Sequence, residues 1–80
     1  MFIYYGGVNI MSVCYNKLWK LMIDKKMKKK DLIAVSGISR STVAKLTHDE
    51  NVNTEVLVRI CTALECDIGD IMEIIHENKD

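Results

Sequence analysis

The sequence predicts an all-α fold of five short helices, and its composition and spacing carry that prediction. The 80 residues include no proline and four glycines, whereas the turns of a β-sandwich usually need many of both. Hydrophobic residues make up 49% of the chain, which suffices for one small core and argues against disorder. Along much of the chain they recur every three or four positions, as in an amphipathic helix. We therefore expect a single small helical domain.

The chain is expected to consist of a tail, one helical domain and a second tail, at residues 1–14, 15–76 and 77–80. In the first tail, the aromatic and β-branched residues 2–5 (FIYY) could form a short strand before a turn at Gly6 and Gly7. The first ten residues could instead be disordered, or pair with a second copy of the chain. The sequence leaves these alternatives open, and it also allows the compact domain to start at Met11.

Capping residues mark where the first four helices begin and end. Ser39 and Asn53 each have a side-chain oxygen that can accept a hydrogen bond from the first turn of a following helix. Gly37 suits the left-handed conformation that often follows a helix end. The helices are thus expected at residues 16–25, 29–35, 40–47 and 54–64. Their inward faces are expected to consist of Leu18, Leu21, Met22, Leu32, Val35, Val43, Leu46, Val56, Leu57, Ile60, Cys61 and Leu64, with Trp19 and Ile23 widening the first.

A fifth helix is expected at residues 68–76, with Asp67 as its cap. Asp70 and Glu73 would lie in its early turns, near the positive end of the helix dipole. Its apolar face would consist of Ile68, Ile71, Met72 and Ile75.

The cysteines and the hydropathy pattern exclude several classes of protein. Cys14, Cys61 and Cys66 are odd in number, which argues against a disulfide framework and suggests a reducing, cytoplasmic setting. Neither His48 nor His76 stands at a metal-ligand spacing from them, so no metal or other cofactor is expected. No run of 18 apolar residues occurs, so no membrane span is expected. The sequence also lacks a recognisable nucleophile–base pair or phosphate loop, and an enzyme is not expected.

The charges are unevenly distributed although the net charge is zero. Residues 17–45 contain nine basic and two acidic residues, a net charge of +7. Residues 46–80 contain two basic and nine acidic residues, a net charge of −7. Such a layout can steer one face of a neutral molecule toward a polyanion. Taken alone, the lysine run is explained equally well as a solvated surface.

The stretch DLIAVSGISRSTVAKL, residues 31–46, has the pattern of a helix-turn-helix unit. Two short helices joined by a brief turn with glycine define this unit, and Gly37 allows the turn without a Cβ clash. The apolar positions would pack the second helix across the first. Its outward face would then carry Arg40, Ser41, Ala44 and Lys45, with Ser39 and Thr42 at the margins.

These outward residue types suit the major groove of DNA. Arginine and lysine donate hydrogen bonds to guanine, serine and threonine can donate or accept, and a small alanine permits close approach. At the start of the preceding helix, Lys28, Lys29 and Lys30 could reach phosphates, aided by the exposed N–H groups of the helix end.

Together, DLIAVSGISRSTVAKL and the closing segment LVRICTALECDIGDIM resemble a Cro/phage-repressor-type (XRE family) helix-turn-helix domain over residues 15–75. The resemblance implies a five-helix, repressor-like DNA-binding domain whose second and third helices form the helix-turn-helix. It also implies that Arg40, Ser41 and Lys45 read bases. By the same carry-over, Lys29, Ser39 and Thr42 match phosphate-contacting or marginal positions. Lys28 is expected to contact phosphate because of its place at the helix start, not because of the resemblance.

Three features depart from the pattern of that family. Ile33 stands where many relatives have alanine, which would change how closely the second and third helices approach. Lys28 stands where a serine or threonine often caps the second helix, so the cap is weaker. Asp49 and Glu50 lie in the loop after the third helix, where two carboxylates would repel phosphates.

The resemblance implies a sequence-specific DNA-binding transcriptional regulator, acting as a repressor or autoregulator. One unit of this size reads only a few base pairs, so a homodimer on two half-sites of double-stranded DNA is expected. Its contact would use the N-terminal tail or the last two helices. The alternative is an antitoxin-like or other protein-interaction module of the same fold, whose acidic C-terminal half covers a small basic partner.

Overall fold

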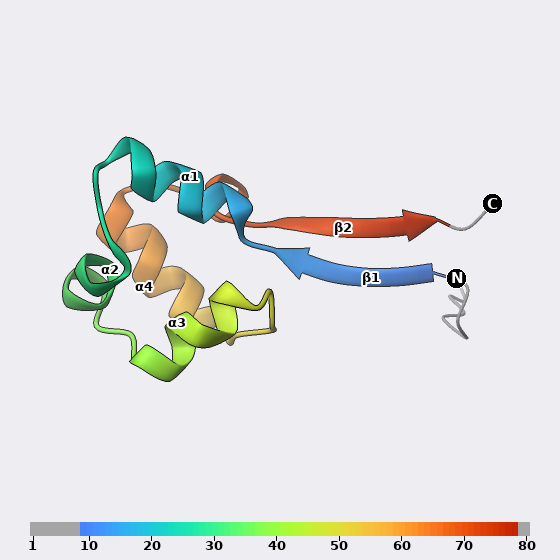
Figure 1. Ribbon diagram of the computed structural model, residues 1–80, viewed down its shortest axis with the longest axis horizontal. Coiled ribbons are helices and arrows are strands. Elements are labelled where there is room, and N and C mark those ends of the chain that lie inside the picture. The colour runs from blue at the N-terminus through green and yellow to red at the C-terminus, as the bar shows by residue number, and fades with distance from the viewer. Residues whose placement is uncertain (1–8, 79–80) are drawn as a thin grey trace.

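The computed structural model describes residues 9–78, which form a helical body and a two-stranded arm (Figure 1). The elements in chain order are β1 (Asn9–Cys14), α1 (Asn16–Asp24), α2 (Lys29–Ser36), α3 (Arg40–Thr47), α4 (Thr54–Leu64), the 3-10 helix η1 (Ile68–Asp70) and β2 (Glu73–Asn78). The arm extends away from the helices, and the molecule measures 41 × 22 × 21 Å. The strand expected at residues 2–5 and the turn at Gly6 and Gly7 lie outside the described residues.

The ends of the helices are set by the capping residues that the sequence predicts. The Ser39 Oγ accepts a hydrogen bond from the Thr42 N–H at 3.1 Å, and the Asn53 Oδ1 accepts one from the Val56 N–H at 3.0 Å. Gly37 ends α2 in the left-handed conformation, with φ at 76°. The bounds expected for the first four helices are therefore confirmed to within a residue.

The core lies between α1, α2, α3 and α4. Leu18, Leu32, Leu46, Ile60 and Ile71 have no exposed surface. The described core comprises Tyr15, Leu18, Met22, Leu32, Ile38, Val43, Leu46, Leu57, Ile60, Leu64 and Ile71. Most of the predicted inward residues are thus confirmed.

In α1 and α2, two residues predicted to face inward point to solvent instead. Val35 is 54% exposed because Ser36, one turn after Leu32, takes the buried position of α2. The Ser36 hydroxyl donates to the Leu32 carbonyl, so its burial leaves no polar atom unpaired. Ile23 is 72% exposed because the buried stripe of α1 continues through Met22, and the next residue is turned about 100° from it.

The prediction of a fifth helix at residues 68–76 is wrong, and the fold is mostly helical rather than all-α. Asp67 caps as expected, since its carboxylate accepts from the Ile68 N–H at 2.8 Å, but only the 3-10 helix η1 follows. The chain then becomes strand β2 and pairs antiparallel with β1. The adjacent β-branched Ile74 and Ile75 favour extended backbone, and β1 supplies hydrogen-bond partners that no local pattern could reveal.

The arm is joined to the helical body by polar contacts at its base and exposes apolar side chains along its length. Within it Val13 pairs with Ile74 and Ser12 pairs with Ile75. At the base, the Lys17 ammonium donates to the Gly69 carbonyl at 3.1 Å and lies 4.0 Å from the Glu73 carboxylate. Successive strand residues point to opposite faces, so Ile74 and Ile75 expose 50% and 36% of their surface on different sides.

The C-terminus of α4 brings two cysteines together. Glu65 takes the left-handed conformation, with φ at 55°, and the Cys66 N–H donates to the Cys61 carbonyl at 3.0 Å. This is the hydrogen-bond pattern of a Schellman motif, in which these two positions make a side-chain contact. All three cysteines are free thiols, and Cys14 is buried.

Ionisation of the Cys61 thiol should make the protein less stable at alkaline pH. Burial, followed by the neighbouring Cys66 and the charges of Asp67 and Asp70, raises the pKa of Cys61 from 9.0 to about 11. As the pH rises, the unfolded chain therefore loses the Cys61 proton before the folded chain does. The stability that the protonated thiol contributes to the fold below pH 9 is lost as the pH rises toward 11. Denaturant unfolding from pH 8 to pH 11 should show a smaller loss of stability for Cys61→Ala than for the unaltered chain. Equal losses would contradict this expectation.

Candidate nucleic-acid interface

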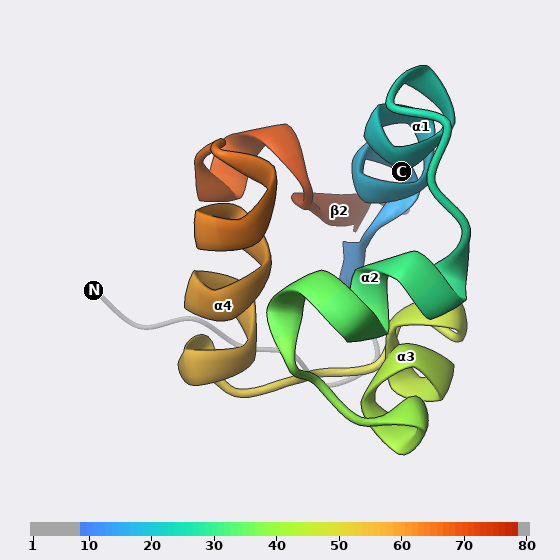
Figure 2. The same cartoon turned by 90° about the vertical axis from the view of Figure 1, so that its left-hand side faces the viewer.

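Helices α2 and α3 lie next to each other at one edge of the helical body (Figure 2). The turn between them starts at Gly37, and an added Cβ there would lie 3.3 Å from the Arg59 Nη1. Ile38 follows in the turn and is buried, as are Val43 and Leu46 on the inner face of α3. The packing predicted for a helix-turn-helix is therefore present, with the opposite face of α3 left open.

The residues predicted to read bases share this open face. Arg40, Ser41 and Lys45 are all exposed on α3, and Ala44 lies exposed between them. None of these four side chains is needed for the core, so the face combines two cations with a small residue and a hydroxyl.

A cluster of three hydroxyls begins α3. The Ser39 Oγ lies 3.0 Å from the Ser41 Oγ and 2.9 Å from the Thr42 Oγ1. Ser39 is exposed and Thr42 is half-buried, in agreement with their predicted marginal positions. The cluster surrounds the N-terminus of α3, where the helix dipole favours an anion.

A shallow hollow of about 370 Å³ separates the outer edges of α2 and α3. Lys30 and Arg40 contribute cations to its lining, whereas Ile33 and Val43 contribute apolar surface. Ile33 is half-buried and packs against the core. The larger side chain that departs from the family pattern is thus accommodated within this junction.

The N-terminus of α2 carries the other predicted phosphate contacts. Lys28 is the capping residue, and its side chain makes no capping hydrogen bond, in agreement with the weak cap that was predicted. Its own N–H donates to the Asp31 carboxylate at 2.8 Å. The Lys28 side chain is exposed.

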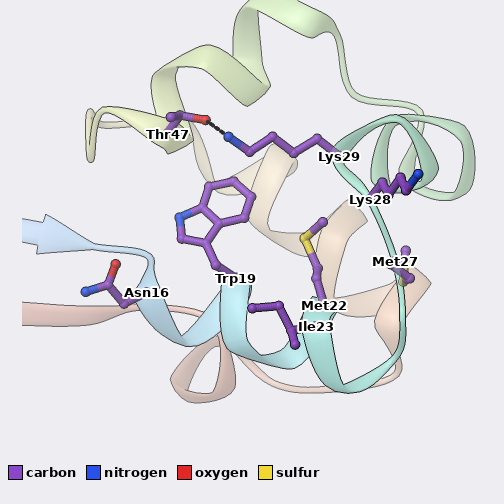
Figure 3. Close-up of a pocket in the computed structure, with 8 residues that line it drawn as sticks. All are labelled: Asn16, Trp19, Met22, Ile23, Met27, Lys28, Lys29 and Thr47. Carbon is purple, nitrogen blue, oxygen red and sulfur yellow. Dashed lines mark hydrogen bonds between the residues drawn. The ribbon is translucent and has the colours of Figure 1, made fainter.

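Lys29 has two partners that the sequence reasoning missed (Figure 3). Its Nζ donates to the Thr47 Oγ1 at 2.9 Å and lies 4.8 Å from the centre of the Trp19 ring. Trp19 was predicted only to widen the buried face of α1, and Thr47 only to end α3. An aromatic residue near a lysine-rich helix start is the one sequence signal that could have suggested a cation–π contact.

The acidic loop after α3 is fastened to the start of α1. The Asp49 carboxylate accepts a hydrogen bond from the Tyr15 N–H at 3.1 Å, and the Tyr15 hydroxyl donates to the Glu50 carbonyl at 2.8 Å. Burial, and secondarily the charge of Asp49, raises the pKa of Tyr15. Asp49 therefore has a structural partner within the chain.

Two further sequence predictions concern metal binding and membrane spans. Among the described residues, no three histidine, cysteine or acidic side chains converge in a way that could hold a metal ion. Within residues 9–78, the helices are also too short and too polar to cross a bilayer.

Comparisons with known proteins agree with this geometry. The family profile of the Cro/C1-type helix-turn-helix DNA-binding domain matches residues 17–77. Among solved structures, the chain is similar to the crystal structure of transcriptional regulator VanUg, Form II, with 49% sequence identity and a TM-score of 0.82. That match covers 96% of this chain and 99% of the other. No curated protein matches the chain significantly. The resemblance inferred from residues 15–75 is confirmed, and the chain belongs to the family of Cro/C1-type helix-turn-helix DNA-binding domains.

Proposed function

We propose that this protein is a sequence-specific transcriptional regulator, acting as a repressor or autoregulator, that reads the major groove of DNA with α3. The observation that carries the proposal is the open face of α3, where Arg40, Ser41 and Lys45 stand exposed above a buried inner face. Arginine and lysine can donate to the guanine O6 and N7 atoms, and serine can donate or accept at a base edge. Family membership and the similarity to a transcriptional regulator support this role.

Contacts to the DNA backbone are proposed for residues at the two helix starts. Lys28 and Lys29 begin α2, and Ser39 and Thr42 surround the start of α3. Free N–H groups and the positive dipole ends at both places favour phosphate. Backbone contacts of this kind fix the register of the protein on the duplex, while α3 distinguishes sequences.

The regulator is proposed to act as a homodimer through its arm. A single helix-turn-helix reads few base pairs, and family dimers place two reading helices on neighbouring half-sites. An isolated two-stranded sheet is only marginally stable in water, yet this one exposes Ile74 and Ile75 on its two faces. Packing against the arm of a second copy would cover the isoleucine on the face where the two arms meet.

A second candidate function is a protein-interaction module of the same fold. A hollow of about 350 Å³ at the end of α4 is lined in part by the apolar Val58 and Ile68 and the acidic Glu65 and Asp67. This combination suits a small partner that brings a basic and apolar segment. Unchanged activity in cells after neutralisation of both Arg40 and Lys45 would favour this candidate over DNA reading.

The test of the main proposal is selection of bound sequences from random DNA, followed by affinity measurements at two salt concentrations. A reproducible selected sequence is expected, with affinity falling steeply as salt rises. Absence of binding even at low salt would contradict the proposal.

Arg40→Ala should weaken the base preference of the protein at one position of each DNA half-site. Loss of an arginine–guanine contact costs about 1–3 kcal/mol on the preferred sequence and little on sequences that lack this guanine. Affinities for the selected duplex and its single-base variants measure the effect. Lys20→Ala is the control, because Lys20 is exposed on α1 beside a hollow that it shares with Glu65 and Asp70. An equal loss on every sequence would contradict base reading by Arg40.

A further inference from the structure

We propose that Trp19 and Thr47 are positioning residues, which hold the Lys29 ammonium in place for a DNA backbone phosphate. The inference rests on the proposed function, because it assigns a role in a contact that only DNA binding would use. Its observations are nevertheless separate from the reading face of α3: they are a hydrogen bond and a cation–π contact that join three helices (Figure 3).

The direction of the hydrogen bond to Thr47 is determined by its surroundings. The Thr47 Oγ1 donates its own hydrogen to the Val43 carbonyl at 2.9 Å. It must therefore accept the hydrogen bond that comes from the Lys29 Nζ at 2.9 Å. Thr47 is also the last residue of α3, and a cation is favoured at this negative end of the helix dipole.

Trp19 approaches the same ammonium from α1. Its ring centre lies 4.8 Å from the Lys29 Nζ, within the range of a cation–π interaction. The ring is half-buried and packs against the core, so it offers a fixed surface. One ammonium hydrogen is committed to Thr47, which leaves donor capacity on the side away from the ring for a phosphate oxygen.

The surroundings of Lys29 suit an anion. The open cleft beside Trp19 has a volume of about 470 Å³, and no acidic residue is among those that line it. Lys28 adds a second cation to the lining. The first-turn N–H groups of α2 lie at the same end of the helix.

Restraint of Lys29 before binding has an energetic consequence. A free lysine side chain loses much rotamer freedom when it is fixed against a phosphate. Here Trp19 and Thr47 have already restricted that freedom, so less is lost when DNA binds. Lys28 and Lys30 are exposed in the same turn, and we expect them to contribute less to affinity than the restrained Lys29.

The experiment measures affinity for the selected duplex at several salt concentrations. Lys29→Met should reduce the slope of log affinity against log salt by about 0.9 for each Lys29 that contacts DNA. Thr47→Val keeps the side-chain shape but removes the acceptor, and should weaken binding about fivefold. Thr47→Ser should bind almost as tightly as the unaltered protein. Lys20→Met controls for loss of one positive charge.

The decisive comparison places Thr47→Val in the background of Lys29→Met. If Thr47 acts through Lys29, it should then have no further effect on affinity. The same fivefold loss in both backgrounds would overturn the inference, as would tighter binding by Thr47→Val, which would mean that the contact withholds Lys29 from DNA. Failure of the unaltered protein to bind any duplex would instead remove the proposed function.

A measurement on the free, unaltered protein tests the geometry without relying on a variant that could misfold. The Trp19 ring current should shift the NMR signals of the Lys29 side-chain methylenes upfield, because the ammonium lies over the ring face. Trp19→Leu should abolish this shift. Signals at the ordinary lysine position in the unaltered protein would show that Lys29 is not held, and would overturn the inference whatever the DNA affinities are.

Discussion

Leu46→Ala is expected to lower the free energy of unfolding by about 2–5 kcal/mol. Leu46 has no exposed surface, and it fastens the inner face of α3 to the core. Its truncation removes buried apolar contacts and leaves a cavity that a small domain can fill only in part. A chain of this size is stabilised by roughly 4–12 kcal/mol, so the loss is a large fraction of the total. Urea unfolding followed by circular dichroism measures it.

Val35→Ala is the matched control for this prediction. Both residues belong to the helix-turn-helix and were predicted from sequence to face inward, but Val35 is exposed to solvent. Its truncation should change stability by no more than about 0.5 kcal/mol. A comparable loss for the two variants would contradict the packing of α2 and α3 described here. DNA affinity should fall for Leu46→Ala under conditions where part of the protein unfolds.

Combined replacement of Ile74 and Ile75 by threonine is expected to weaken binding to the selected DNA duplex by about a hundredfold or more. Threonine is β-branched and compatible with a strand, so the pairing of β2 with β1 should persist. The polar side chains would remove the apolar surface that we propose joins two arms. Without the dimer, each half-site is bound independently, and the advantage of linked binding is lost. Sedimentation and DNA titration measure the two effects.

Val58→Thr is the control for the arm variant. Val58 is 53% exposed on α4, and the same kind of substitution there should leave both the oligomeric state and the affinity unchanged. A dimeric arm variant with unaltered affinity would exclude the arm as the dimer contact. A monomeric Val58→Thr variant would assign that contact to α4.

The helices were predictable because their signals are local. Ser39, Asn53 and Gly37 act on neighbouring backbone groups, so their effect on a helix end can be inferred without knowledge of the rest of the chain. The apolar spacing then identified most of the core. It failed at Val35 because the third and fourth residues after Leu32 both lie near the inward face of a helix, and Ser36 takes the buried position.

The C-terminal segment was not predictable from its own residues. Ile71 and Ile75 have helical spacing, and Asp67 caps the turn before them, so each local feature is consistent with a helix. The backbone of β2 is instead satisfied by β1, which lies about sixty residues earlier in the chain. Strand pairing of this kind depends on a partner that is far away in the sequence, so it cannot be predicted from the residues of one segment alone.

The candidate DNA-binding site was likewise predictable from the sequence only in part. The sequence by itself determined the helix-turn-helix and the residue types on the open face of α3, because both follow from short-range spacing in residues 31–46. The family was identified by the resemblance of that stretch and of the closing segment LVRICTALECDIGDIM. Only the tertiary structure decided that residues 9–14 and 73–78 form an arm and that Lys29 meets Trp19 and Thr47. Those contacts join residues from three helices, and their geometry depends on how the helices pack rather than on any pattern along the chain.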